Sequence, residues 1–224
     1  MTAPDTDVAV PRLLVQAGVT TMDPALLRLA LTHASKDKKV NNERLEFLGD
    51  RVISLVLADA IYTAYPDEAE GDLALRHAAL ARMEVLADIA RRYDLGADMI
   101  AATPRNGGGA VVDVDNVLAD AVEALIGALY RDQGYTTCDR VVRFLWADVL
   151  GAMVTPPRDP KTVVQEWTQG RGLPLPVYAQ IARTGPDHAP EFTVELRIRG
   201  VDPVTATGPS RRLAEKAAAS KMME

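Results

Sequence analysis

The sequence predicts an all-α domain followed by a small α+β domain, and three observations support this fold class. Apolar residues recur at intervals of three and four from about residue 8 to residue 150, which is the period of an amphipathic helix. No stretch before residue 150 alternates apolar and polar residues as a strand does. A proline-rich segment follows, after which helix-like and strand-like patterns alternate. We therefore expect a helical domain over 1–153, a linker over 154–160 and an α-β-β-β-α domain over 161–224.

The helical period is carried by five stretches of the first part. Pro66, Gly71, Gly96 and a glycine-rich run at 105–110 punctuate these stretches and indicate where helices end. The run at 105–110 precedes an acidic motif, so its mobility is expected to affect access to that motif. We expect helices within 24–35, 44–65, 71–93, 113–135 and 137–154.

The pattern of apolar and polar residues in the second part differs from that in the first. Two adjacent prolines and a third nearby block a continuing helix over 154–160. The segments 176–185 and 191–200 alternate as strands do and are joined by the polar loop "PDHAP"; 202–208 offers a third strand. With helical segments at 159–172 and 209–223, the expected unit is a sheet with helices on one face.

The composition excludes several classes of protein. Hydrophobic residues make up 48% and charged residues 25% of 224 residues, which indicates neither disorder nor a fibrous protein. No apolar run reaches the length of a membrane span, and the first residues lack the pattern of a secretory signal. We therefore expect a cytoplasmic protein without a membrane partner. Three histidines and the single Cys138 cannot form a standard zinc site, so any metal would be held by oxygen.

The charge is divided unevenly along the chain. A net charge of −6 ordinarily argues against a nucleic-acid partner, because phosphates are bound by Lys and Arg. Residues 158–224, however, hold ten basic and eight acidic residues, a net charge of +2, which leaves −8 for the remainder. The acidic part is the helical one.

Acidic residues lie beside apolar runs on two predicted helices. Glu43, Glu46 and Asp50 fall within an arc of roughly 60° on one helix. Asp120 and Glu123 are three residues apart on another. A carboxylate in such a setting is costly unless it is paired or binds a cation. Acidic pairs from two helices can hold a hard divalent cation and leave positions for water and a phosphate.

Two other interpretations of these acids are open. Acids at helical spacing are usually solvated surface residues. For two such pairs, a solvated surface and a metal site are about equally well supported. A carboxylate-bridged redox bundle needs Glu-x-x-His pairs, but Gly49 and Ile126 stand where the histidines would be, which disfavours it.

Several motifs resemble one known family. "NNERLEFLGD" resembles the signature of the ribonuclease III family, and "LADAVEALIGALY" is similar to its second acidic motif. "LALTHAS" and "EGDLALRHAALAR" resemble its early helix and its acidic turn. "DPKTVVQEWTQGRGLPLPVY" and "GPSRRLAEKAAASKM" resemble a double-stranded-RNA-binding domain, as in bacterial members. The motifs cover nearly the whole chain in the family's order.

The resemblance implies an endoribonuclease for double-stranded RNA that processes ribosomal and messenger precursors. It implies Mg²⁺ as cofactor, with Mn²⁺ able to substitute, and products with a 5′-phosphate, a 3′-hydroxyl and short 3′ overhangs. The implied metal ligands are Glu46, Asp50, Asp120 and Glu123, of which Asp50 and Glu123 are also the catalytic pair. Glu43 and Glu70 match two further acids nearer the RNA.

The resemblance also implies partners. The family works as a homodimer, and Phe47 matches an aromatic residue that inserts into the second subunit. Because Glu215 lies among the basic residues of the last helix, we expect the RNA affinity of this domain to be modest and salt-sensitive. The residues implied to contact duplex RNA are Gln165, Glu166, His188, Ser210, Arg211, Arg212 and Lys216.

One alternative function stays open at this point, a regulator that binds double-stranded RNA without cutting it. Four further residues are given structural roles. His33 is expected to be structural rather than a ligand, because hard-cation sites favour oxygen. Cys138 is expected to be at least half buried, and Trp146 and Trp167 are expected to be core aromatics.

Overall fold

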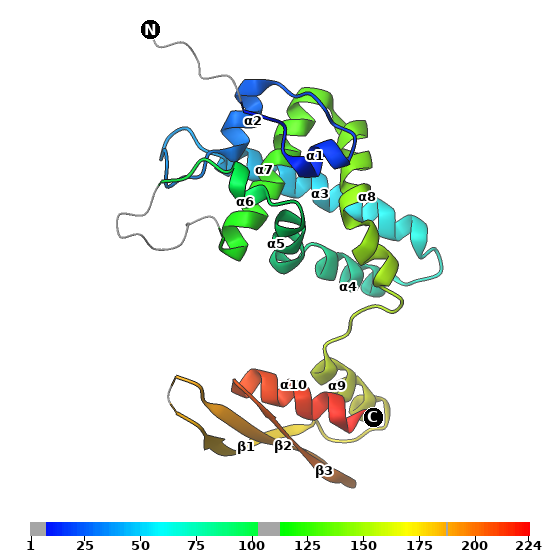
Figure 1. Ribbon diagram of the computed structural model, residues 1–224. Helices are drawn as coiled ribbons and strands as arrows, with labels where there is room; N and C mark the ends of the chain where they lie inside the picture. Colours follow the sequence, from blue (N-terminus) through cyan, green and yellow to red (C-terminus); the bar gives the residue numbers. More distant parts are fainter. Residues whose placement is uncertain (1–7, 103–112, 187) are drawn as a thin grey trace. The chain divides into compact units, whose positions relative to one another are not determined.

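The computed structural model describes residues 8–102, 113–186 and 188–224 and divides the chain into two compact units, Met1–Pro156 and Pro157–Glu224 (Figure 1). The regular secondary structure in the described part of the first unit is helical, apart from one isolated bridge between Thr32 and Ile100. The second holds a three-stranded sheet and two helices. The predicted fold class is therefore confirmed. The glycine-rich run at 105–110 lies outside the described residues.

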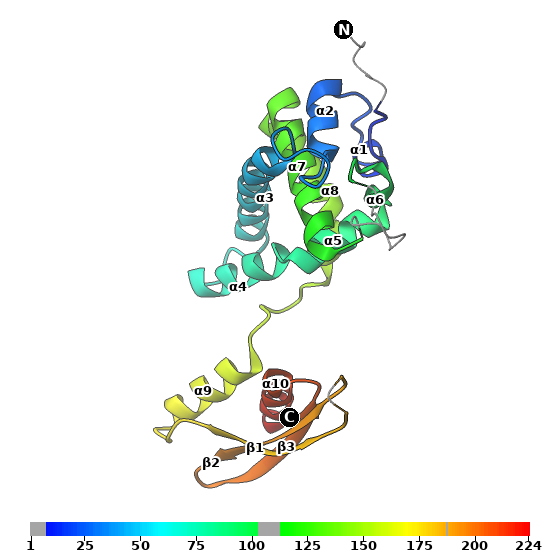
Figure 2. The same ribbon diagram turned by 90° about the vertical axis from the view of Figure 1, so that its left-hand side faces the viewer.

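The first unit is built around two helices, α3 and α7, that pack against each other (Figure 2). Between residues 117 and 129 of α7, all residues except Asp120 and Glu123 are buried. A helix buried on nearly every side is the centre of a core rather than a surface element. The helices of this unit are α1 Arg12–Gln16, α2 Pro24–Leu31, α3 Glu43–Ala64, α4 Glu70–Leu80, α5 Met83–Arg92, α6 Leu95–Asp98, α7 Asp115–Gln133 and α8 Tyr135–Ala152.

Local signals set several of the helix ends. The Asp23 carboxylate accepts hydrogen bonds from the backbone N–H groups of Ala25 and Leu26, at 2.8 and 3.0 Å, and Pro24 occupies the first position of α2. Gly134 separates α7 from α8 with φ of 77°, a conformation that favours glycine. The chain can therefore turn sharply between the two helices.

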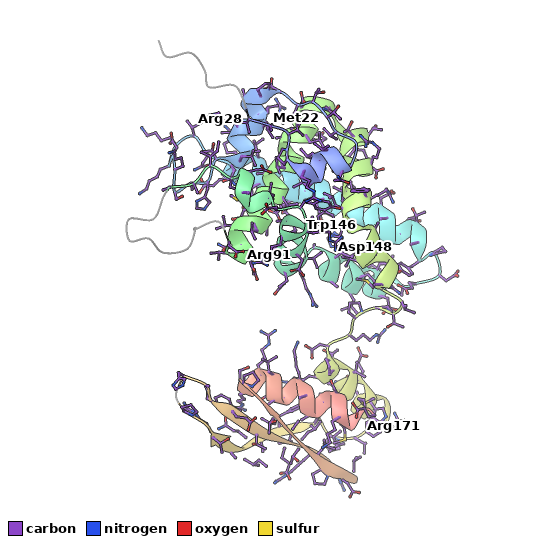
Figure 3. The ribbon with its side chains drawn as sticks, in the orientation of Figure 1. Met22, Arg28, Arg91, Trp146, Asp148 and Arg171 are labelled. Carbon is purple, nitrogen blue, oxygen red and sulfur yellow. The ribbon has the colours of Figure 1, made fainter. Side chains whose placement is uncertain are left out.

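The segment expected to be helical over 71–93 is divided into α4 and α5. Arg82 has an extended backbone, with ψ of 142°, although neither glycine nor proline stands at this point. The indole Nε1 of Trp146 donates a hydrogen bond to the carbonyl of Leu80, at 3.0 Å, and so satisfies a group that the end of α4 leaves open. Trp146 is fully buried among the helices (Figure 3), which confirms it as a core aromatic.

A buried arginine joins the end of α8 to α4. Arg76 is 1% exposed and makes two hydrogen bonds to the Glu68 carboxylate, at 2.6 and 2.8 Å. It also donates to the carbonyl of Met153, at 2.7 Å, and its guanidinium lies 3.5 Å from the centre of the Tyr65 ring. The Tyr65 hydroxyl donates to the same Met153 carbonyl, at 2.8 Å. These contacts fix the chain where it leaves the helical unit.

The second unit has the element order predicted from the sequence. Its antiparallel sheet has the order β1-β2-β3, and both helices lie on one face of it (Figure 2). Its core includes Val164, Leu196 and Ala218. Trp167 is only partly buried and packs against this core, with the Arg171 guanidinium 4.2 Å from its ring centre. The elements are α9 Pro160–Gly170, β1 Val177–Thr184, β2 Glu191–Ile198, β3 Val201–Gly208 and α10 Arg211–Met222.

Within the described ranges, every helix is too short or too polar to cross a bilayer.

Candidate active site

Two glycines let α3 and α7 approach backbone to backbone. A Cβ atom added at Gly49 would lie 1.7 Å from the carbonyl oxygen of Glu123, and one added at Gly127 would lie 2.1 Å from that of Leu45. Any larger side chain at either position would force the helices apart. The contact point is thus built from the backbone of residues that flank the acidic motifs.

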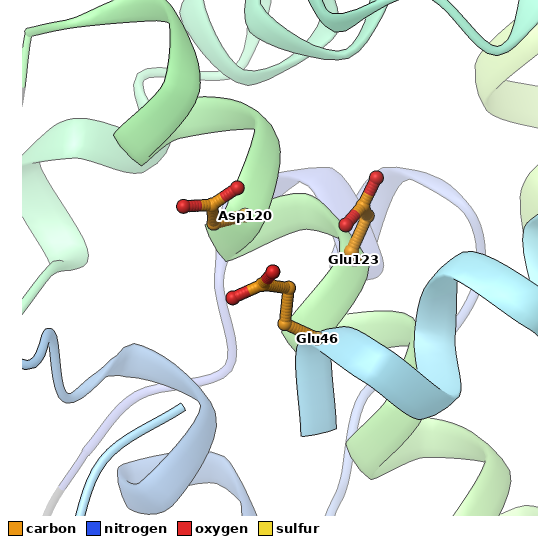
Figure 4. A group of neighbouring side chains, drawn as sticks. All are labelled: Glu46, Asp120 and Glu123. Carbon is orange, nitrogen blue, oxygen red and sulfur yellow. The ribbon is translucent and has the colours of Figure 1, made fainter. Parts of the chain in front are cut away.

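Three carboxylates meet beside this crossing (Figure 4). Glu46 comes from α3, one turn before Gly49, and Asp120 and Glu123 come from neighbouring turns of α7. One carboxylate oxygen of each lies within 4.8 Å of the others. All three residues are half-buried. The two acidic motifs that the sequence singled out therefore form one cluster.

The environment opposes negative charge on this cluster. Burial raises the pKa of Glu123 to about 7, and the charges of Asp120 and Glu46 add to the effect, while Arg51 works against it. Burial also raises the pKa of Glu46, with Asp120 and Glu43 contributing. The pKa of Asp120 is raised by burial as well. Three like charges held this close repel one another, and either a proton or a bound cation relieves the repulsion.

The donor set fits a hard divalent cation. The cluster offers carboxylate oxygens, which Mg²⁺, Mn²⁺ and Ca²⁺ prefer, and no sulfur or imidazole ligand lies within it. Mg²⁺ commonly takes only one or two carboxylates from a protein and completes its shell with water and phosphate oxygens. Half-buried ligands at the edge of a helix pair suit that arrangement.

The other predicted acids lie outside this cluster. Asp50 is one turn beyond Glu46 on α3, and its carboxylate pairs with the guanidinium of Arg51. Glu43 is exposed in the first turn of α3, and Glu70 is exposed at the start of α4. The structure thus brings together three of the four expected ligands.

His33 has partners of its own. Its Nδ1 accepts a hydrogen bond from the backbone N–H of Ser35, at 3.1 Å, and lies 2.8 Å from the Ser35 hydroxyl oxygen. These contacts agree with the structural role expected for it. Against the larger effect of burial, His33 lowers the pKa of Asp120, a link to the cluster that sequence reasoning missed.

Apolar side chains are exposed along one face of α3. Phe47, Leu55 and Tyr62 are 66%, 57% and 71% exposed, and their spacing of eight and seven residues keeps them on the same side of the helix. The Arg51 guanidinium lies 5.4 Å from the centre of the Phe47 ring. Of these three residues, only Phe47 was singled out from the sequence. The helical period also places Leu55 and Tyr62 on the same face of the helix as Phe47.

The residues expected to contact RNA lie on three elements of the second unit. Gln165 and Glu166 are exposed on α9, and His188 is exposed in the loop between β1 and β2. A surface hollow of about 610 Å³ lies between this loop and the turn before α10, lined by His188, Glu191 and Pro209 among others.

The start of α10 presents groups suited to anions. The Ser210 side chain accepts a hydrogen bond from the Leu213 N–H, at 3.3 Å, and so caps the helix. Arg211 and Arg212 are exposed in its first turn. Lys216, by contrast, is partly buried and pairs with Asp159, at 2.7 Å.

Comparisons with known proteins find a matching family for each of the two units. A family model described as Ribonuclease-III-like matches residues 23–149, and one described as Double-stranded RNA binding motif matches residues 160–224. The chain is 49% identical over 208 residues to Ribonuclease 3 of Caulobacter vibrioides, covering 90% of this chain and 89% of the relative. It is 45% identical over 210 residues to Ribonuclease 3 of Rhodopseudomonas palustris, covering 92% and 77%.

A solved structure supports the helical unit separately. The nuclease domain of ribonuclease III from Campylobacter jejuni is 36% identical, with a TM-score of 0.57, and the match covers 61% of this chain and 95% of that domain. A helical unit of this fold with an acidic cluster, joined to a double-stranded-RNA-binding unit, defines an endoribonuclease that acts on duplex RNA. The chain belongs to the ribonuclease III family.

Proposed function

We propose that this endoribonuclease hydrolyses double-stranded RNA with Mg²⁺ held by Glu46, Asp50, Asp120 and Glu123, and that Mn²⁺ can replace it. The observation that carries the proposal is the cluster of Glu46, Asp120 and Glu123, with ligand atoms within 4.8 Å of one another. A bound Mg²⁺ would lower the pKa of a coordinated water and neutralise charge that develops on the phosphoryl group. Arg51 and His33 offset part of the negative charge of this cluster, but the pKa values of all three carboxyl groups stay raised.

The residues of the chain would divide the work. Glu46 and Asp120, from different helices, would fix the position of the cation relative to the RNA backbone. Asp50 and Glu123 would orient the attacking water and take part in moving its proton, because a carboxyl group beside the cation can accept a proton from that water. Glu43 and Glu70, which are exposed, would lie nearer the RNA. Hydrolysis would leave a 5′-phosphate and a 3′-hydroxyl.

The second unit would recognise the shape of the duplex. Side chains reach 2′-hydroxyls and phosphates across the wide minor groove of A-form RNA, whereas its major groove is too narrow to read. Gln165 and Glu166 would face one minor groove and His188 the next. Ser210, Arg211, Arg212 and Lys216 would meet the phosphates between them, where the N-terminus of α10 also attracts anions.

The exposed apolar face of α3 supports a homodimer. Phe47 would insert into a second copy, where a surface hollow of about 810 Å³ lined by Leu26, Leu29 and Phe47 itself is available to receive it. Two subunits that each cut one strand would give products with short 3′ overhangs. We propose that the protein works in the cytoplasm on ribosomal and messenger RNA precursors.

Three parts of the chain would carry these roles, a nuclease domain over 1–153, a linker over 154–160 and an RNA-binding domain over 161–224. The compact units meet between Pro156 and Pro157, inside this linker, and α9 starts at Pro160. Prolines that interrupt regular structure here support these proposed boundaries.

A gel assay of a long end-labelled RNA duplex tests the proposed function. Cleavage is expected in Mg²⁺ or Mn²⁺, with short duplex products whose 5′ ends are phosphorylated. Single-stranded RNA of the same sequence should stay intact, because α9 and α10 would recognise duplex shape. A duplex that is bound in a gel shift but stays uncut in both metals would contradict the nuclease and favour a regulator that binds without cutting.

A further inference from the structure

Two basic side chains of α10, Arg211 and Lys216, and Lys161 of α9 are already engaged by acids of the same unit. The Glu215 carboxylate pairs with Lys161 Nζ at 2.6 Å and with Arg211 Nε at 2.9 Å. The Asp159 carboxylate pairs with Lys216 Nζ at 2.7 Å. Three cations on or beside the expected phosphate-binding surface are therefore held by two carboxylates.

The Glu215 end of these ion pairs is largely shielded from solvent. The Glu215 side chain is only 12% exposed. Burial works to raise the pKa of Glu215, but hydrogen bonds from Lys161 and Arg211 outweigh it and lower the pKa. Lys161 is also fixed by the Tyr178 ring, whose centre lies 4.7 Å from its Nζ. The pairs are thus ordered and ionised near neutral pH.

Asp159 serves two partners at once. One carboxylate oxygen accepts a hydrogen bond from the Lys161 backbone N–H, at 3.0 Å, and caps α9, while the other pairs with Lys216. The hydrogen bond from Lys216 is the largest cause of the lowered pKa of Asp159. A phosphate that approaches Lys216 therefore meets a carboxylate already in place.

We propose that Glu215 and Asp159 compete with the phosphates of duplex RNA for Lys161, Arg211 and Lys216, and thereby limit the affinity of the RNA-binding unit. The inference rests on the proposed role of α10 in RNA binding. A phosphate oxygen and a carboxylate oxygen make the same kind of charge-assisted contact, so RNA must displace the acid to gain the cation. Weaker binding favours release of the cut duplex after each turnover.

Two substitutions remove the charge of a competing carboxylate but keep the size of the side chain, so they test the competition with little effect on folding. Asp159→Asn keeps an oxygen that can cap α9, because Asn is as good a capping residue as Asp, but removes the charge that holds Lys216. Glu215→Gln keeps the size of the side chain and a hydrogen-bond acceptor. Asp202→Asn is the matched control, since Asp202 is exposed at the far end of β3 and forms no ion pair within the part of the chain that the structure describes.

The experiment measures binding of the full chain to a labelled RNA duplex by fluorescence anisotropy in EDTA, where no cleavage occurs. Asp159→Asn and Glu215→Gln are each expected to bind about two- to fivefold more tightly than the wild type at low salt, because a surface ion pair contributes a factor of this order. The gain should shrink as salt is raised. Asp202→Asn should show a smaller gain than either.

The outcomes distinguish this inference from the proposed function. Unchanged or weaker binding by both variants, with thermal unfolding like that of the wild type, overturns the competition. If the Glu215→Gln variant does not fold, the binding of Asp159→Asn alone tests the competition, because the asparagine still caps α9. A gain equal to that of Asp202→Asn also overturns it, since net charge would then be the cause. A wild-type protein that binds no duplex contradicts the proposed RNA-binding role itself.

Discussion

Substitution of Gly49 by alanine tests the helix crossing that positions the acidic cluster. The new Cβ atom would lie 1.7 Å from the Glu123 carbonyl oxygen, whereas real Cβ atoms essentially never approach closer than 3.0 Å. The obstacle is backbone on a fully packed helix, so α3 and α7 must separate. Overpacking of this kind costs up to about 3 kcal/mol. Alanine returns about 1 kcal/mol of helix propensity, which leaves a loss of up to about 2 kcal/mol.

The same displacement should disturb the site. Metal ligands tolerate shifts of only a few tenths of an ångström, roughly 0.2 Å, so a separation of α3 from α7 by more than this should weaken metal binding. Stability is measured by urea denaturation, and Mg²⁺ or Mn²⁺ binding by calorimetry. Gly151→Ala is the matched control, because nothing lies within 4 Å of its added Cβ in α8. Its stability should be unchanged or slightly higher. A Gly49→Ala protein with wild-type stability and metal affinity would refute the reasoning.

Three further predictions concern buried or half-buried groups. Arg76→Met should lower stability by about 3 kcal/mol in urea denaturation, because it leaves the Glu68 carboxylate without its partner and removes one of the two hydrogen bonds to the Met153 carbonyl; no loss would contradict this. Burial raises the pKa of Cys138 to about 12, so the native thiol should not react with a thiol reagent until the protein unfolds, whereas rapid labelling would show it accessible. Glu123 has a pKa of about 7 without metal and must ionise to bind it, so Mg²⁺ affinity in calorimetry should fall about fivefold from pH 7 to pH 6; constant affinity would contradict this.

The sequence predicted the elements whose signals are local. The helical period identified α3 and α7, and the spacing of Asp120 and Glu123 predicted that both face the same way. The division between α4 and α5 has no glycine or proline to signal it, and the Leu80 carbonyl at the end of α4 is satisfied by Trp146, 66 residues away. Arg76 likewise has the pattern of a surface charge on an amphipathic helix, and only tertiary packing buries it.

The site was predicted only in part, because it too depends on tertiary packing. The spacing on α3 places Glu43, Glu46 and Asp50 in one stripe, but it does not determine which of them faces α7. That choice depends on the crossing at Gly49 and Gly127, where Glu46 alone of the stripe reaches the carboxylates of α7. The ion pairs Lys161–Glu215 and Lys216–Asp159 join residues more than fifty positions apart and have no local signature, whereas Arg211 and Glu215 are four residues apart on one helix.

Replacement of Glu123 by glutamine tests the central claim most directly. The substitution keeps the shape of the side chain and removes the charge that a cation would bind, and Glu84→Gln on α5, an exposed acid outside the cluster, is the control. Cleavage of a labelled RNA duplex in Mg²⁺ and binding of the same duplex in EDTA are measured for the wild type and both variants. The account predicts that Glu123→Gln binds RNA as the wild type does but loses cleavage by at least about a hundredfold, while Glu84→Gln keeps both. Cleavage by Glu123→Gln at the wild-type rate would contradict the assignment of the acidic cluster as the catalytic metal site.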